Sequence, residues 1–218
     1  VVSRIAFSTQ AEVLQTLQQA IVGCLNELIV STTREAGARP EEVFAATVVG
    51  NTTMQHLLLG VSPAALAQAP YVPVVEDAVH LSGEELGLRI ASGGRVWLLP
   101  NIAGWVGADT VGVILATRLY AQDDLALAID IGTNGEMALG SRQRLVTCST
   151  AAGPAFEGAH LSCGMRAADG AIDRVRIEGD VAWHTIGEAA PRGVCGSGLV
   201  DVVAEMLRAG VITSTGMM

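Results

Sequence analysis

Residues 125–140 read LALAIDIGTNGEMALG. An apolar run ends at Asp130, a short segment with two glycines follows, and residues 136–139 form a second extended run. Two extended runs joined through Gly132–Gly135 predict a β-hairpin with the Asn-Gly pair at its bend.

The predicted bend has the chemistry of an anion site. Glycines allow the N–H groups of a turn to converge on one point, and a neighbouring carboxylate can hold Mg2+ through water. We expect Asp130 to hold the metal and the backbone to contact the phosphates of a nucleotide at Gly132, Thr133, Asn134 and Gly135. A plain surface hairpin remains the alternative, because short motifs often occur by chance.

Composition narrows the class of protein. Half of the 218 residues are hydrophobic and 25 are glycine, which is typical of an α/β protein with many tight turns. The formal net charge is −9 and the basic residues do not cluster, which argues against nucleic-acid binding. The most apolar long window, residues 96–116, contains Pro100, Asn101 and Asp109, so we expect no membrane span.

The cysteines and the ends of the sequence carry two further expectations. Cys24, Cys148, Cys163 and Cys195 are scattered without a Cys-x-x-Cys pair, so no zinc or iron–sulfur site is predicted and a reducing, cytoplasmic environment is favoured.

The sequence begins without methionine inside helical sequence and ends just after a turn. We therefore expect a piece of a longer protein.

A long amphipathic helix is predicted over residues 11–36. Its core-facing stripe is predicted to consist of Leu14, Leu17, Ile21, Cys24, Leu25 and Leu28. Cys24 is accordingly interpreted as a small core residue.

A strand over 43–49 and a helix over 54–59 are predicted next. Thr52 or Thr53 is expected to cap that helix. We interpret His56 as a histidine with satisfied hydrogen bonds, since no second ligand stands at helical spacing.

Residues 60–94 are predicted to be an irregular excursion with one short helix near 82–86. A strand over 95–99 and a helix over 108–119 follow, in which Gly107 and Gly112 allow close packing. Asp109, in the first turn of that helix, either favours the helix dipole or faces the anion site.

The last third of the chain carries a second glycine-rich loop. A strand over 144–150 and a hairpin over 171–186 precede it. Residues 193–198 read GVCGSG and lead into a helix over 199–209, so the phosphate is expected to be contacted by Gly196, Ser197 and Gly198, with Ser197 also capping the helix. The alternative is a tight turn whose glycines serve packing only.

The order of these elements resembles parts of two related lobes of the actin-like (RNase H-like) fold, an α/β fold of mixed sheets flanked by helices. It is the fold of the superfamily of acetate and sugar kinases, heat-shock chaperones and actin. Residues 130–135 resemble its second phosphate loop. The resemblance implies the end of a first lobe over 1–120 and the start of its sister lobe over 121–218.

Within this superfamily, seven blocks in one order resemble the reductive activators of corrinoid proteins. They are residues 48–54, 99–104, 107–110, 130–136, 151–158, 163–167 and 193–201. The resemblance implies an ATP-dependent activator that reduces cob(II)alamin to cob(I)alamin in a corrinoid protein, with the electron supplied by a ferredoxin-type 2Fe-2S domain. It implies ATP and Mg2+ as cofactors, Asp130 and Asp109 as catalytic residues and a possible homodimer.

This sequence departs from that family pattern in three ways. The ferredoxin domain, the first phosphate loop and the adenosine-binding motif do not occur in it. We expect the piece to hold half of an ATP site and to be inactive alone.

Two other functions stay open. One is a non-catalytic actin-like docking or assembly module with a vestigial site. The other is an enzyme with Cys195 as nucleophile, because a helix N-terminus lowers the pKa of a thiol, although no histidine base is near in sequence.

Overall fold

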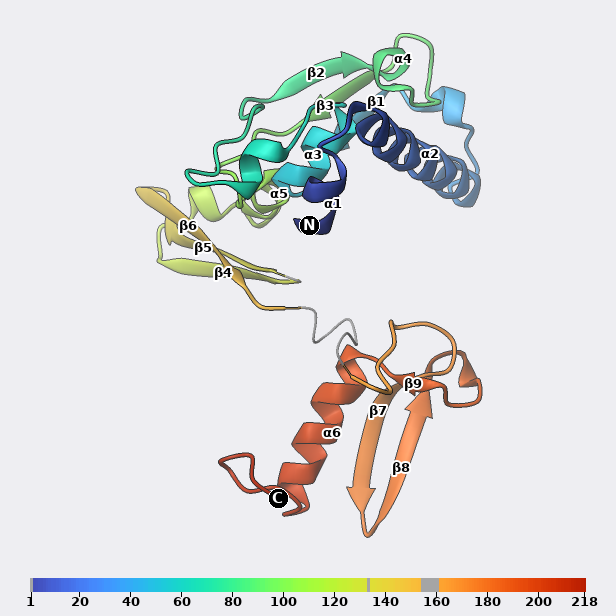
Figure 1. The fold of residues 1–218 in the computed structure, drawn as a ribbon, viewed down its shortest axis with the longest axis vertical. Coiled ribbons are helices and arrows are strands. Elements are labelled where there is room, and N and C mark those ends of the chain that lie inside the picture. Colours follow the sequence, from blue (N-terminus) through green and yellow to red (C-terminus); the bar gives the residue numbers. More distant parts are fainter. Residues whose placement is uncertain (1, 133, 154–160) are drawn as a thin grey trace. The chain divides into compact units, whose positions relative to one another are not determined.

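The computed structural model describes residues 2–132, 134–153 and 161–218. The chain divides into two compact units (Figure 1). The first comprises Val1–Ile129 and Glu136–Ser149, and the second comprises Asp130–Gly135 and Thr150–Met218. The lobe boundary at residue 120 stays a prediction.

The first unit contains most of the helices. Its helices are α1 (Val2–Phe7), α2 (Ala11–Glu35), α3 (Thr52–Leu58), α4 (Gly83–Leu86) and α5 (Ala108–Thr117). Short 3-10 turns occur at Pro40–Glu42, Ala64–Ala67 and Leu119–Ala121. The predicted helices over 11–36, 82–86 and 108–119 are confirmed to within three residues at their ends.

A three-stranded sheet forms the centre of this unit. Its order is β1 (Ala45–Val48), β3 (Arg95–Leu98) and β2 (Val79–Ser82). β1 and β3 run parallel, with Val48 opposite Leu98, and β2 is antiparallel to β3. The strands predicted at 43–49 and 95–99 are confirmed, while β2 lies in the stretch that was predicted to be an irregular excursion.

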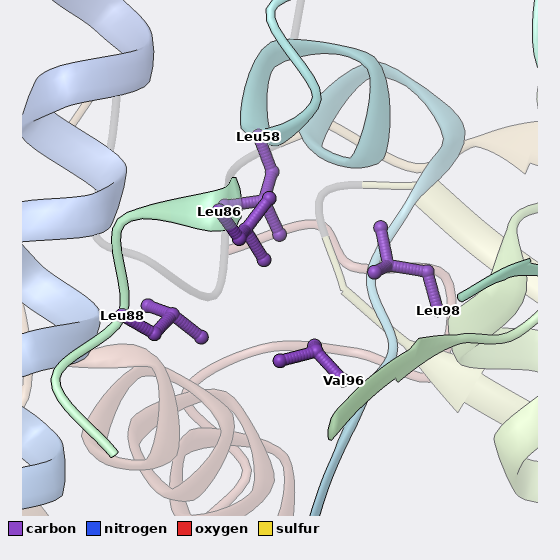
Figure 2. Packing of buried hydrophobic residues seen from close by; sticks show 5 residues of the cluster. All are labelled: Leu58, Leu86, Leu88, Val96 and Leu98. Carbon is purple, nitrogen blue, oxygen red and sulfur yellow. The ribbon is translucent and has the colours of Figure 1, made fainter. Parts of the chain in front are cut away.

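One face of this sheet carries the main hydrophobic core. Figure 2 shows its five buried members, Leu58, Leu86, Leu88, Val96 and Leu98. They come from α3, from the region of α4 and from β3, and α2 covers them with Ile21, Val22, Leu25 and Ile29. Removing these side chains from water is the main driving force for assembling the sheet and the helices.

The buried stripe of α2 differs from the prediction. Cys24 and Leu28 are exposed, so their assignment to the core is wrong. The buried side of the helix passes instead through Asn26, whose amide donates to the Gly87 carbonyl and accepts from the Arg89 N–H.

By length and composition α2 could cross a membrane, but core helices of soluble proteins pass the same test.

The N-cap of α3 also differs from the prediction. Asn51, and neither Thr52 nor Thr53, caps the helix, because its side-chain oxygen accepts from the Met54 N–H at 2.9 Å. Thr52 instead lies inside the first turn and donates its hydroxyl to the carbonyl of Ala103.

His56 is fully buried and ties α3 to the chain before β2. Its Nδ1 is 2.7 Å from the Thr52 carbonyl oxygen, and its Nε2 accepts from the backbone N–H groups of Val74 and Val75. Only the neutral ring with a proton on Nδ1 fits these partners. The interpretation of His56 as a satisfied histidine is confirmed.

The start of α5 lies directly against the chain between β1 and α3. A Cβ on Gly107 would lie 2.7 Å from the Asn51 Cα and 2.8 Å from the Gly50 carbonyl oxygen. A Cβ on Gly112 would approach only the Val49 side chain, at 3.3 Å. Both glycines therefore allow the close packing that was predicted.

A second sheet follows α5 along the chain. Its order is β4 (Ala126–Ile131), β5 (Asn134–Ser141) and β6 (Arg144–Ala151). On one face of it Ala126, Ala128 and Ala138 pack against Ile114 and Leu119. The alternate residues Leu125, Leu127, Ile129 and Ile131 of the first strand and its approach are exposed.

The second unit is built on a hairpin and one helix. β7 (Ala171–Glu178) and β8 (Asp180–Thr185) pair antiparallel, and β9 (Gly193–Val194) pairs with the start of β7. A 3-10 turn at Ile186–Glu188 precedes β9, and α6 (Gly196–Arg208) lies alongside β7 (Figure 1). The predicted hairpin around Gly179 is confirmed, and α6 begins three residues before the predicted helix.

We predict that His56 makes the protein less stable in mild acid. Burial lowers the pKa of His56 from its usual value of 6.5, so below that value the unfolded chain binds more protons than the folded chain. The free energy of unfolding should therefore rise from about pH 5 to about pH 7. Urea unfolding at several pH values measures this slope.

His80 provides the control for this experiment, because it is exposed and lies edge-to-face with the Trp97 ring. His56→Ala should flatten the slope, whereas His80→Ala should keep it. An unchanged slope in His56→Ala would contradict the prediction.

Gly107→Ala should destabilise the protein by about 2 kcal/mol, because its new methyl group meets backbone atoms that cannot rotate away. Gly112→Ala is the matched control. Its methyl group meets one side chain, and alanine gains about 1 kcal/mol of helix propensity over glycine. Thermal unfolding of the two variants compares them, and equal midpoints would contradict this explanation.

Candidate phosphate-binding elements

The β4–β5 hairpin carries the first group of candidate residues. β4 ends at Ile131 and β5 begins at Asn134, so the bend lies before the Asn-Gly pair and not on it. Asp130 is exposed at the end of β4. Strand alternation places it on the same side of β4 as Ala126 and Ala128.

One backbone N–H group of the bend already has a hydrogen-bond acceptor within the hairpin. The Gly132 N–H donates to the Asn134 carbonyl at 3.0 Å, so in this conformation that amide is occupied. A Cβ on Gly135 would lie 3.3 Å from Thr150 Cγ2, which shows how closely β5 and β6 approach there. Thr133 lies outside the described residues, as does most of the block 151–158.

Asp109 lies in the first turn of α5, where its charge favours the helix dipole. Its N–H donates to the Gly50 carbonyl at 3.3 Å, and its Oδ1 accepts from the Thr110 N–H at 2.9 Å. The half-buried carboxylate thus lies at the start of α5, which packs through Gly107 against the chain that follows β1. Its catalytic role stays a prediction.

Gly196, Ser197 and Gly198 form the first turn of α6. The residue at the N-cap is Cys195, which makes no side-chain capping bond, so the expectation that Ser197 caps the helix is wrong. The first N–H groups of a helix lack partners within the helix, and they carry its positive dipole end. The turn therefore keeps the chemistry of an anion site.

Gly198 also has a packing role. A Cβ at this position would lie 2.1 Å from the carbonyl oxygen of Ile172 in β7. Glycine is therefore required for α6 to approach the strand. Close packing and anion binding, which the sequence offered as alternatives for this loop, are compatible in the same turn.

The environment of Cys195 does not favour a nucleophile. The side chain is 1% exposed, and its thiol donates to the Ile172 carbonyl oxygen at 3.3 Å and lies 3.2 Å from Ser197 Oγ. A buried thiol whose hydrogen bond goes to a backbone carbonyl is shielded from substrates that approach from solvent. These contacts favour a structural role.

Within the described residues, no group of three or more His, Cys, Asp or Glu side chains could form a metal cage. A magnesium ion that keeps most of its waters needs only one or two carboxylates besides phosphate oxygens. An exposed Asp130 at a strand end fits that requirement. The residues present thus suit a water-mediated Mg2+ contact.

The contacts of α6 with β7 include two carboxylates that sequence reasoning missed. Asp201 and Glu205 accept hydrogen bonds from backbone N–H groups of β7. The only signal in the sequence is an acidic pair at i and i+4 on an otherwise apolar helix. That spacing shows a shared helix face but does not show which strand lies opposite.

Comparison with known proteins agrees with the fold and defines its class. A family model described as the C-terminal domain of RACo, the ASKHA domain, matches residues 124–218. The model of the RACo middle region matches residues 1–122. The fold is therefore an actin-like one, with mixed sheets flanked by helices.

The names of two similar proteins refer to corrinoid activation and to reduction of a corrinoid protein. The chain is 39% identical to the corrinoid activation enzyme RamQ of Eubacterium limosum over 99% of its length, covering 36% of that protein. Over 52% of the chain it is 40% identical to the [Co(II) methylated amine-specific corrinoid protein] reductase of Methanosarcina barkeri, covering 21% of that protein.

A solved structure, a reductive activator for corrinoid, iron–sulfur protein, matches the whole chain with a TM-score of 0.85 and 41% identity, over 35% of its own length. The chain belongs to the RACo family of reductive activators of corrinoid proteins. It spans about a third of the length of RamQ and of the solved activator.

We predict that Cys195 resists alkylation in the native protein. Cys24, Cys148 and Cys163 are exposed and should react with iodoacetamide, while Cys195 should react only after unfolding. Mass spectrometry of peptides from native and urea-treated protein measures this. The three exposed cysteines serve as internal controls, and rapid native labelling of Cys195 would restore the nucleophile hypothesis.

Proposed function

We propose that this chain is the ATP-binding actin-like core of a metalloprotein activator, whose whole protein drives the reduction of cob(II)alamin to cob(I)alamin in a corrinoid protein. The observation that supports it is the match of the entire chain to reductive activators at about 40% identity. The partner is then a corrinoid protein. The activity belongs to the whole protein and not to this stretch alone.

In this proposal the bend of the β4–β5 hairpin and the first turn of α6 both contact the phosphates of ATP. Asp130 holds Mg2+ through water, and N–H groups of the hairpin bend contact the β- and γ-phosphates. The first turn of α6 adds N–H groups from Gly196, Ser197 and Gly198, whose positive dipole end favours an anion. Asp109 orients water. Magnesium, when bound, neutralises charge on the phosphates.

The electron enters from elsewhere in the proposed protein. Three of the four cysteines are exposed and the fourth is buried. Among the described residues, no group of three or more cysteine, histidine or acidic side chains lies close enough together to hold a cluster. We place a 2Fe-2S cluster in a separate domain of the whole protein. The reducing, cytoplasmic setting inferred from the scattered cysteines belongs to the same proposal.

The test uses the protein expressed from its full reading frame. Asp130→Ala should weaken MgATP binding by about tenfold or more, because a charge-assisted contact to the metal's water shell is lost. It should slow cob(II)alamin reduction in the corrinoid partner by at least as much. Calorimetry measures the first effect, and the change in the corrinoid absorption spectrum measures the second.

Asp123→Ala is the matched control, because Asp123 is an exposed carboxylate that pairs with exposed Arg142 at 2.8 Å. This variant should bind MgATP as the wild type does. Unchanged ATP affinity and turnover in Asp130→Ala would refute the role of that residue. Lack of any MgATP affinity in the wild-type protein would favour the docking or assembly module instead.

A further inference from the structure

β7 has a hydrogen-bonding edge that its own sheet leaves largely open. The order of that sheet is β8, β7 and β9, and β9 pairs only with Ala171 and Ile172. Beyond Ile172, no other strand of the described residues pairs with this edge. An open edge of this kind would attract other extended chains.

Two carboxylates of α6 occupy this edge. The Val175 N–H donates to Asp201 Oδ2 at 3.2 Å, and the Ile177 N–H donates to Glu205 Oε2 at 2.9 Å. Glu205 is only 6% exposed, and its other oxygen accepts from the guanidinium of Arg208. A buried carboxylate with both oxygens occupied in this way fixes the position of the helix that carries it.

The geometry of a helix and of a strand explains how two acids of α6 reach two N–H groups on the same edge of β7. Four residues of α-helix rise about 6 Å, and alternate residues of a strand are separated by about 6.6 Å. Acids at i and i+4 on α6 therefore match N–H groups at j and j+2 on β7. The pairs Asp201 with Val175 and Glu205 with Ile177 have this spacing.

The contacts between α6 and β7 extend to the start of the helix. The Cys195 N–H donates to the Ile172 carbonyl at 3.1 Å, and Gly198 lies so close to that carbonyl that no Cβ fits. Polar contacts thus follow α6 from its N-cap to its last turn along one strand. The N-terminal turn cannot shift along β7 without breaking the contacts of both acids.

We infer that Asp201 and Glu205 take the place of a neighbouring strand and are positioning residues for the N-terminal turn of α6. They accept from two N–H groups on the edge of β7 and set the register of the helix. The consequence for phosphate binding at Gly196–Gly198 rests on the proposed function, whereas the hydrogen bonds to β7 do not.

Amide hydrogen exchange at single-residue resolution tests the inference in the full-length protein. Asp201→Ala should accelerate exchange of the Val175 amide by about tenfold or more, and Glu205→Ala should do the same for Ile177. Glu205→Gln keeps an oxygen that can accept, so it should hold the Ile177 rate within about threefold of wild type.

Glu178→Ala is the control, because Glu178 is an exposed carboxylate on β7 that pairs with Arg176 at 3.2 Å. It should leave the exchange rates of both amides unchanged. Wild-type rates in Asp201→Ala and Glu205→Ala would overturn the inference, and so would equal acceleration of both amides in the control. Should Glu205→Ala fail to fold, Asp201→Ala and Glu205→Gln decide the question.

Calorimetry with MgATP on the same variants tests the consequence for the phosphate contact. Glu205→Ala should weaken binding by about tenfold and Glu205→Gln should restore it, because the hydrogen bond and not the charge positions the helix. Equal weakening in both variants would overturn positioning through that bond. Wild-type protein without MgATP affinity would refute the proposed function, and the exchange rates alone would then decide the inference.

Discussion

The starts of two helices approach neighbouring backbone so closely that neither position can hold a Cβ atom. Gly107 lies against the backbone of residues 50–52, and Gly198 lies against the Ile172 carbonyl. At both places a Cβ would overlap main-chain atoms, which cannot move aside as a side chain can. The positions of α5 and α6, and of the Asp109 and Gly196–Gly198 elements that they carry, follow from this constraint.

Local regularities of the sequence predicted most of the elements. Apolar spacing located α2, β1, β3 and the β7–β8 hairpin, and the short helix predicted near 82–86 is α4, which begins with a capping box at Ser82. The errors arose where tertiary contacts choose among locally equivalent residues. Cys24 and Leu28 are apolar at helical spacing, but the chain around Gly87 packs on the side of the helix that carries Asn26.

The candidate site could be predicted only in part. The residues at the hairpin and at the start of α6 were identified from glycine, aspartate and helix signals, because turns and helix ends are local features. The hydrogen bonds of Asp201 and Glu205 to β7 depend on register between segments that are more distant in sequence. Composition and spacing within one segment carry no information about that register.

The replacement of a strand by a helix also affects how the chain is made. β7 leaves the ribosome before α6, so its amides at Val175 and Ile177 lack their native acceptors until Asp201 and Glu205 have emerged. During that interval the nascent hairpin offers a bare edge, which is the kind of segment that associates with other unfinished chains. Synthesis of α6 itself then ends the exposure, without the arrival of another strand.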